Sequence, residues 1–279
     1  YTTLFFSLFL NRKIKKSVFI QCLEWKVISN NIIIQFLSKI LHFICFARID
    51  NFIYANKLLK EDFERDKIMN KLFFFKNNKR IIYPVGHRFK LNVNSNIKRD
   101  IDILIILRNN WVKRHFLYIK TLSYLIEKNK NNSSNYNLRI INLSSEPIPK
   151  WIHKFKKVDI SEEVSHIDLF SLYKRSKVLL YLSSYEGFGL PPLEAMSQGC
   201  IPIISENRGQ YNYMDSNSDL ILKKSCNPEE IICKLILILN EKKEINNIRK
   251  NILIKNANNY YNLAEKKREE EINNIVKAL

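Results

Sequence analysis

The sequence predicts an α/β fold built on a doubly wound parallel sheet, and three observations lead to that prediction. Apolar runs such as Ile101–Leu107 and Val178–Leu182 lack the apolar–polar alternation of half-exposed strands, which indicates strands buried on both faces. Segments with the apolar spacing of an α-helix separate these runs. The two kinds of segment alternate along the chain, and this order favours crossover helices between parallel strands.

The first third of the chain follows this pattern. We expect strands at Ser17–Gln21, Asn51–Ala55 and Arg80–Pro84, where β-branched and aromatic residues gather. A charged helix is expected to begin near Asn56, because asparagine is a favoured N-cap residue.

A further helix is predicted over Ile33–Phe46. Its apolar residues recur at intervals of three and four positions, and they are Ile33, Phe36, Leu37, Ile40, Leu41 and Ile44. The polar residues on the other side are Gln35, Ser38, Lys39 and His42. We therefore expect the apolar side of this helix to face the core. A helix lying on a membrane surface is the alternative, and the lightly basic polar side disfavours it.

The rest of the chain repeats the unit of strand, loop and helix. The expected strands are Ile101–Leu107, Leu138–Leu143, Val158–Ile160, Val178–Leu182 and Cys200–Ile204. The expected helices cover Arg114–Glu127, Trp151–Phe155, His166–Arg175, Ile231–Leu239 and 241–279, with a short one after Pro191 and Pro192. The polar segment Lys90–Asp100 is typical of a linker, so we expect a domain boundary after residue 97.

Composition limits the class of protein. With 279 residues, 46% of them hydrophobic, the chain has room for one large or two medium domains. The net charge of +19 has two explanations. One is a general enrichment in Ile, Asn and Lys, and the other is an anionic partner such as a phosphorylated substrate, an anionic membrane or nucleic acid. No zinc-knuckle or helix-turn-helix signature supports nucleic acid.

The cysteines indicate a reducing compartment. The five of them are scattered, odd in number and without a close pair, which is typical of a cytoplasmic protein. Neither the cysteines nor the histidines have the spacing of metal ligands, so we expect no metal site. No apolar run reaches the roughly 18 residues of a membrane span.

The segment Ser183–Ser205 concentrates the signals of a binding site. It follows an apolar strand, turns at Gly187 and Gly189, begins a helix at two prolines and ends in a second strand. Such a turn presents backbone N–H groups at a helix N-terminus, where phosphate is stabilised. Two carboxylates, Glu186 and Glu194, enclose the turn with seven residues between them.

Glu186–Met196 resembles the signature of retaining glycosyltransferases of the GT-B fold, in particular glycosyltransferase family 4. Nearly every position of that signature is present, both glutamates included. Arg108 and Lys113 keep the separation of an arginine and a lysine in another loop of the family, although Leu107 replaces its glycine. The resemblance covers residues 98–255 and, more weakly, 30–97. It implies a complete nucleotide-sugar-binding domain of Rossmann-like type over 98–255, a partial, N-terminally truncated acceptor-side domain over 1–97, and a charged helix over 256–279.

The resemblance also implies the roles of the site residues. Arg108 and Lys113 would stabilise the diphosphate leaving group in place of a metal, so no metal or other cofactor is expected. Glu186 would contact the transferred sugar, and Glu194 would accept hydrogen bonds from the donor ribose. The turn residues that would bind sugar and phosphates are Gly187, Phe188, Gly189 and Leu190. The base is expected near Val158–Glu163.

Each assignment has a plainer alternative. Arg108 and Lys113 would then be solvated surface charges, and Glu186 would be an ordinary loop carboxylate. Glu194 would stabilise the helix dipole, and Phe188 would be a hydrophobic plug.

The function implied by the resemblance is retaining transfer of a sugar from a nucleotide-diphosphate donor to a saccharide or lipid-linked acceptor, in polysaccharide or glycoconjugate biosynthesis. The expected partners are this nucleotide sugar and this acceptor, without nucleic acid. The expected location is the cytoplasm, and the basic charge permits peripheral contact with an anionic membrane. Three alternatives stay open: a nucleotide-sugar-binding fragment or module without catalysis, a GT-B nucleotide-sugar epimerase, and a basic nucleic-acid binder.

Overall fold

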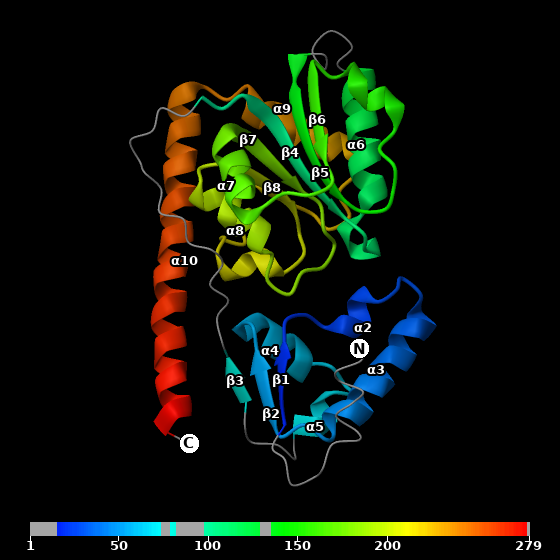
Figure 1. Ribbon diagram of the computed structural model, residues 1–279, viewed down its shortest axis with the longest axis vertical. Helices are drawn as coiled ribbons and strands as arrows, with labels where there is room; N and C mark the ends of the chain where they lie inside the picture. The colour runs from blue at the N-terminus through cyan, green and yellow to red at the C-terminus, as the bar shows by residue number, and fades with distance from the viewer. Residues whose placement is uncertain (1–15, 74–78, 82–97, 129–134, 278–279) are drawn as a thin grey trace. The chain divides into compact units, whose positions relative to one another are not determined.

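The computed structural model describes residues 16–73, 79–81, 98–128 and 135–277 of the chain (Figure 1). The chain divides into two compact units. The first unit comprises Tyr1–Val85, Glu186–Phe188 and Tyr261–Leu279, and the second comprises Gly86–Tyr185 and Gly189–Tyr260. The linker predicted over Lys90–Asp100 falls mostly outside the described residues, so the domain boundary after residue 97 stays a prediction.

The second unit is built on a six-stranded parallel sheet. Its strands are β4 (Ile101–Arg108), β5 (Asn137–Leu143), β6 (Lys157–Ser161), β7 (Ser176–Tyr181), β8 (Ile201–Ser205) and β9 (Ile221–Leu222). Their order across the sheet is β6-β5-β4-β7-β8-β9. The parallel sheet and five of its strands agree with the prediction, and the short strand Ile221–Leu222 was not predicted. The central strands are buried on both faces, and Ile103 of β4 lies beside Val178 of β7. Their continuous apolar runs therefore mark strands that are buried on both faces, as the sequence indicated.

Helices cover both faces of this sheet (Figure 1). They are α6 (His115–Lys128), α7 (His166–Arg175), α8 (Leu190–Ser197) and α9 (Pro228–Leu239), joined by the short 3₁₀ helices η1 (Trp111–Lys113), η3 (Lys150–Lys154) and η4 (Gly209–Asn212). Helix α6 packs against α9, and α7 packs against α8 and β4. Local signals set the helix starts, because the Ser165 and Asn227 side chains accept hydrogen bonds from backbone N–H groups three residues on.

The strand order defines where a ligand can bind to the second unit. The chain leaves β4 toward β5 on one side, whereas the later strands β7, β8 and β9 continue on the other side. At such a reversal of order, the connections at the carboxyl ends of two neighbouring strands diverge and leave a crevice. In this sheet the reversal lies between β4, which ends at Arg108, and β7, which precedes the segment Ser183–Ser205.

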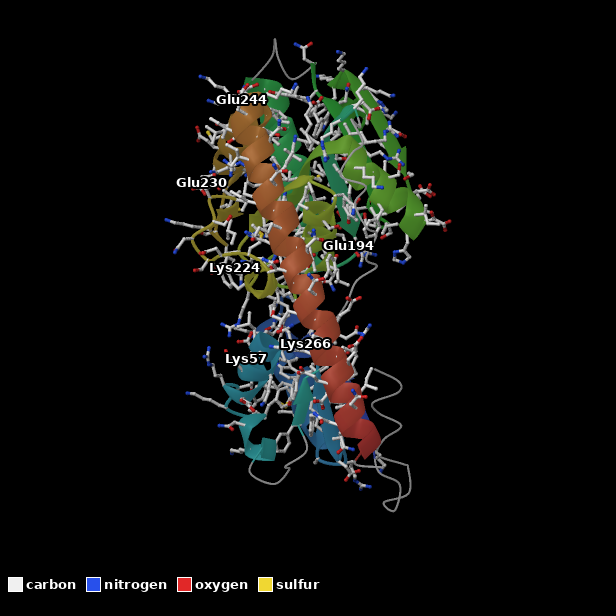
Figure 2. The ribbon with its side chains drawn as sticks, turned by 90° about the vertical axis from the view of Figure 1, so that its left-hand side faces the viewer. Lys57, Glu194, Lys224, Glu230, Glu244 and Lys266 are labelled. Atoms are coloured by element: carbon white, nitrogen blue, oxygen red, sulfur yellow. The ribbon has the colours of Figure 1, made fainter. Side chains whose placement is uncertain are left out.

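Helix α10 (Lys243–Lys277) ends the described chain, and Figure 2 labels Glu244 near its start and Lys266 further along it. The boundary predicted after residue 255 falls inside this continuous helix. Its first part belongs to the second unit and is held there by Arg249. The Arg249 guanidinium donates to Asp219 Oδ1 at 2.8 Å and to Glu241 Oε1 at 2.7 Å. No helix in the described part of the chain is both long and apolar enough to cross a membrane.

Replacing Arg249 by methionine should lower the free energy of unfolding by about 1–3 kcal/mol, because the carboxylates of Asp219 and Glu241 lose their shared cation. Burial raises the pKa of Asp219, but the hydrogen bond and charge of Arg249, with Lys234, outweigh this effect and hold it below the usual value. A carboxyl whose pKa is depressed by folding stabilises the fold above its unfolded pKa, and the effect is lost as pH falls through the folded pKa.

Thermal unfolding measured from neutral to acid pH tests this prediction. The variant should melt at a lower temperature at neutral pH and should lose less stability than the wild type on acidification. Lys255→Met on the same helix is the matched control, because Lys255 is exposed and has no ion-pair partner among the described residues. Equal losses in the two variants would contradict the role given to Arg249.

The first unit contains a three-stranded parallel sheet of order β1-β2-β3. Its strands are β1 (Ser17–Ile20), β2 (Asn51–Tyr54) and β3 (Lys79–Ile81), and its helices are α2 (Glu24–Val27), α3 (Ile32–Phe46), α4 (Lys57–Glu64) and α5 (Asn70–Phe73). Aromatic rings fill the core between them: Trp25, Phe46, Phe52, Tyr54 and Phe63. The predicted strands are confirmed, apart from residues 82–84, which lie outside the described residues.

Helix α3 forms where predicted but faces the other way. Ile33 and Leu37, expected in the core, are 65% and 59% exposed, whereas His42 is 2% exposed. The predicted orientation is therefore wrong. The reason is that polar residues on the inner side find specific partners: His42 Nε2 lies 3.2 Å from Glu24 Oε2, and its ring packs edge-on against Trp25.

Candidate functional site

The loop after β4 positions the two predicted cations. Arg108 is the last residue of β4 and is exposed at the carboxyl edge of the sheet. Asn110 shapes the loop, because its side chain accepts a hydrogen bond from Val112 N at 3.1 Å and caps η1. Lys113 closes η1, with its ammonium 5.9 Å from the centre of the Tyr181 ring. The left-handed Arg114 (φ 54°) then turns the chain into α6.

Hydrogen bonds join this loop to the ends of β7 and β8. Ser184 N donates to Val112 O at 2.8 Å, and the Ser184 hydroxyl donates to the same oxygen at 3.2 Å. The Ser205 hydroxyl donates to Ser183 O at 2.9 Å. Three strands that end at the same edge of the sheet are thus fixed relative to one another. The loop that carries Lys113 and the start of the segment Ser183–Ser205 are therefore fixed relative to each other.

Gly189 begins α8 in a conformation that suits glycine. It is the N-cap residue with φ 82°, a left-handed value that residues with a side chain rarely adopt. The Tyr213 hydroxyl donates to Gly189 O at 2.7 Å and holds the turn. Pro191 and Pro192 have no N–H, so Gly189 and Leu190 supply the backbone donors at this helix start. This turn has the shape predicted from the sequence.

Glu194 is buried inside the second unit. Its side chain is held by α8, is 6% exposed and accepts a hydrogen bond from the Tyr173 hydroxyl at 3.4 Å. Burial and the Glu194 carboxylate raise the pKa of Tyr173, and the positive charge of Arg108 opposes that shift. Tyr173 therefore lies within electrostatic reach of both Glu194 and Arg108. Glu194 is the fifth residue of α8, beyond the turn where the helix dipole acts, which disfavours the dipole alternative.

Tyr173 is a site residue that sequence reasoning missed. It lies on the predicted helix His166–Arg175, and its side chain is fully buried. Nothing in the sequence connects its hydroxyl with Glu194, which lies 21 residues further along the chain. The contact arises because α7 packs against α8.

The other predicted residues belong to the first unit. Glu186, Gly187 and Phe188 group with it, and within that unit the Asn56 side-chain amide donates to Gly187 O at 2.7 Å. A Cβ on Gly187 would lie 1.9 Å from Gln21 O, so this position has no room for a side chain. Phe188 is 7% exposed, which favours the plug alternative for its ring.

The second unit therefore contains five of the eight predicted site residues, namely Arg108, Lys113, Gly189, Leu190 and Glu194. The placement of Glu186, Gly187 and Phe188 relative to these five stays a prediction, as does each assigned role.

A pocket of about 760 Å³ opens beside this edge, at the carboxyl ends of β5 and β6. Its lining includes Asn142, Ser144, Glu146, Ile160, Glu162 and Glu163. The Asn109 amide, next to Arg108, donates to Ser145 Oγ at 3.0 Å and so links the loops after β4 and β5. His115 Nδ1 lies 2.8 Å from Glu146 Oε2 at the same loop. The region Val158–Glu163, where the base was expected, contributes three of these residues.

Within the described ranges, no group of three or more His, Cys, Asp or Glu side chains is arranged to hold a metal ion. The expectation that the site needs no metal stays a prediction.

Comparison with known proteins gives the family. The model of the family described as glycosyl transferases group 1 matches residues 88–255, which is more than half of the chain. The O-antigen chain mannosyltransferase RfbU of Salmonella typhimurium is 33% identical over 93 residues, which cover 31% of this chain and 26% of RfbU. The putative glycosyltransferase 41 of Sulfolobus islandicus filamentous virus is 47% identical over 47 residues, which cover 17% of this chain and 14% of the viral protein.

Solved structures give the fold. A mutant of S. aureus TarM, in complex with fondaparinux, α-GlcNAc-glycerol and UDP, has a TM-score of 0.69 and 18% identity, and the match covers 93% of this chain and 50% of TarM. The pneumococcal O-GlcNAc transferase GtfA, with UDP and GlcNAc, has a TM-score of 0.68 and 14% identity, over 95% of this chain and 53% of GtfA.

This chain spans about half the length of the two solved structures and a smaller share of the two curated relatives. The parallel α/β architecture confirms the predicted GT-B fold. From the family match and the fold together, the chain belongs to the glycosyl transferases group 1 family.

Proposed function

We propose that this chain binds a nucleotide-diphosphate sugar and forms the donor side of a retaining glycosyltransferase. One observation supports this most strongly. Arg108 and Lys113 lie at the carboxyl end of β4, and Glu194 lies on α8, the helix that follows β7. The strand order of the second unit's sheet reverses between β4 and β7. Ligands of open parallel sheets bind at this position.

The cations would stabilise the leaving group. As the bond from the sugar to the diphosphate breaks, negative charge grows on the diphosphate oxygens, and fixed positive groups stabilise that charge more than they stabilise the bound donor. The Arg108 guanidinium offers two parallel N–H donors, and the Lys113 ammonium is a point charge. The N–H groups of Gly189 and Leu190 would add neutral donors. No metal ion enters this proposal.

Carboxylates would hold the two sugar rings. Glu194, whose carboxylate accepts a hydrogen bond from Tyr173, would also accept hydrogen bonds from the ribose hydroxyls. Glu186 would stabilise the positive charge that develops on the transferred sugar. In a retaining enzyme of this type the acceptor attacks from the side that the diphosphate leaves.

The base would occupy the pocket at β5 and β6. A volume of about 760 Å³ lies in the range of small-molecule sites. The pocket adjoins the β4 loop through the contact of Asn109 with Ser145, so a nucleotide could reach from Arg108 into it.

The acceptor and the biological setting follow from the relatives. RfbU is an O-antigen chain mannosyltransferase, and TarM and GtfA were solved with UDP. We propose a saccharide or lipid-linked acceptor, a role in polysaccharide or glycoconjugate biosynthesis, and a cytoplasmic location. A second candidate is a nucleotide-sugar-binding module without transfer, because the family model matches residues 88–255 and five of the predicted site residues lie in the second unit.

Release of nucleoside diphosphate from a panel of UDP- and GDP-sugars, measured together with binding, tests the proposal. We expect one donor to bind and to release its diphosphate faster when a suitable acceptor saccharide is present. Glu186→Gln should slow release while the donor still binds. Binding without release would instead identify the binding module. Failure of every donor to bind, together with salt-sensitive binding to duplex DNA, would contradict both candidates and favour the nucleic-acid alternative.

A further inference from the structure

Helix α3 presents an apolar side to solvent. Eight apolar residues of this helix are between 37% and 79% exposed, and we call them the α3 apolar face: Ile32, Ile33, Ile34, Phe36, Leu37, Ile40, Leu41 and Ile44. They follow one another along the fifteen residues of the helix. Soluble monomers rarely expose contiguous apolar surface of this kind, and such a surface marks an interaction site.

Polar contacts on the inner side of α3 fix the orientation of the helix. On the opposite side of α3, His42 Nδ1 lies 2.7 Å from Ser38 O, and His42 Nε2 lies 3.2 Å from Glu24 Oε2. Lys39 forms an ion pair with Asp66 at 2.7 Å. Rotating the helix to bury its apolar residues would break all of these contacts and leave polar groups without hydrogen-bond partners. The sequence therefore keeps the apolar side outward.

Charge favours an anionic lipid surface over a second copy of the chain as the occupant of the α3 apolar face. Residues 1–85 contain fifteen lysines and arginines against six aspartates and glutamates. Helix α3 itself carries no carboxylate, and the nearby carboxylates of Glu24 and Asp66 are paired with His42 and Lys39. Two copies of so basic a segment would repel each other, whereas an anionic lipid surface would attract it.

The length of α3 fits a helix that lies in a membrane surface. Its fifteen residues span roughly 22 Å, which is too short to cross the hydrocarbon core of a bilayer. A helix with one apolar side and one polar side instead lies in the interface, with the apolar side among the acyl chains.

We propose that the α3 apolar face inserts into the surface of an anionic phospholipid bilayer and holds the chain there. The polar side of α3, with His42 and Lys39, stays packed on its own unit. Docking of this kind needs neither donor nor acceptor, so it can hold or fail separately from the proposed glycosyl transfer.

Flotation with lipid vesicles tests the proposal on the full chain. We expect the wild type to float with phosphatidylcholine vesicles that contain phosphatidylglycerol. Vesicles of phosphatidylcholine alone should bind it more weakly, and added salt should lower binding because it screens the charges. Ile33→Gln together with Leu37→Gln should reduce partitioning by about tenfold or more, because two exposed apolar side chains become polar.

The matched control is the pair Phe116→Gln and Ile167→Gln. These residues are 75% and 70% exposed but lie on α6 and α7 of the second unit, so the control should float like the wild type. Circular dichroism and thermal unfolding should be unchanged in both pairs, because all four side chains are already exposed. Equal flotation of the Ile33/Leu37 pair and the wild type would overturn the proposal. The proposal would also be overturned if the wild type bound neither kind of vesicle and instead formed dimers that the Ile33/Leu37 substitutions abolish.

Discussion

Replacing Arg108 by glutamine is expected to weaken the binding of a nucleoside diphosphate by roughly tenfold to a hundredfold. The guanidinium stands exposed at the carboxyl end of β4, at the reversal of strand order. It has no ion-pair partner among the described residues, so its charge is available to a phosphate. The exposed position also predicts that the variant unfolds at nearly the same temperature as the wild type.

Two fragments of the nucleotide, pyrophosphate and the free nucleoside, make this test more specific. If Arg108 binds phosphate, the variant should lose affinity for inorganic pyrophosphate as well, while affinity for the free nucleoside should change little. The salt dependence of diphosphate binding should also become shallower, because one cation has been removed. Isothermal calorimetry or competition with a fluorescent nucleotide measures all three quantities.

Arg175→Gln is the matched control for this substitution. Arg175 ends α7 just before β7 begins, so it lies at the amino edge of the same sheet, where it pairs with Asp100 at 2.6 Å. Its removal should leave nucleotide affinity unchanged. If the Arg108 and Arg175 variants lose affinity equally, net positive charge rather than a phosphate site accounts for binding.

Replacing Glu194 by glutamine should weaken nucleoside binding by roughly tenfold to a hundredfold, because a carboxylate accepts hydrogen bonds from ribose hydroxyls more strongly than an amide does. Glutamine keeps the shape of the buried side chain and can still accept a hydrogen bond from Tyr173, so the fold should persist. The pattern across ligand fragments should be the reverse of that for Arg108. Nucleoside affinity should fall, whereas pyrophosphate affinity should not.

A 2′-deoxynucleotide adds a second readout. The wild type should prefer the ribonucleotide, and the Glu194→Gln variant should lose most of that preference, because the lost contact is to a ribose hydroxyl. Glu229→Gln in the first turn of α9 is the control for a carboxylate near a helix start. An unchanged preference in Glu194→Gln would contradict ribose recognition by Glu194.

The sheet of the second unit could be predicted from the sequence because its signal is local. The run Ile101–Leu107 differs from β4 by a single residue, and His166–Arg175 coincides with α7. Gly189 also lies in a turn, as the pattern predicted, with a φ of 82°. Apolar runs, caps and glycine turns depend on neighbours in the chain, which a sequence displays directly.

The orientation of α3 and the partner of Glu194 could not be predicted, because both depend on residues distant in the chain. Periodicity shows that α3 has an apolar side but not which side meets the core. That choice rests on His42, which contacts Glu24 eighteen residues earlier. The bond from Tyr173 to Glu194 likewise depends on how α7 and α8 pack. The motif located the candidate site, but it did not supply these contacts.

Hydrogen exchange of backbone amides, read by mass spectrometry with and without a saturating nucleoside diphosphate, is the most direct test of a donor site at the carboxyl edge of this sheet. We expect slower exchange in peptides that cover Arg108–Lys113 and Ser183–Ser205, together with the pocket loops after β5 and β6. Peptides from α3 should not change. Protection confined to other parts of the chain, or none at a nucleotide concentration that calorimetry shows to be saturating, would contradict a donor site at this edge of the sheet.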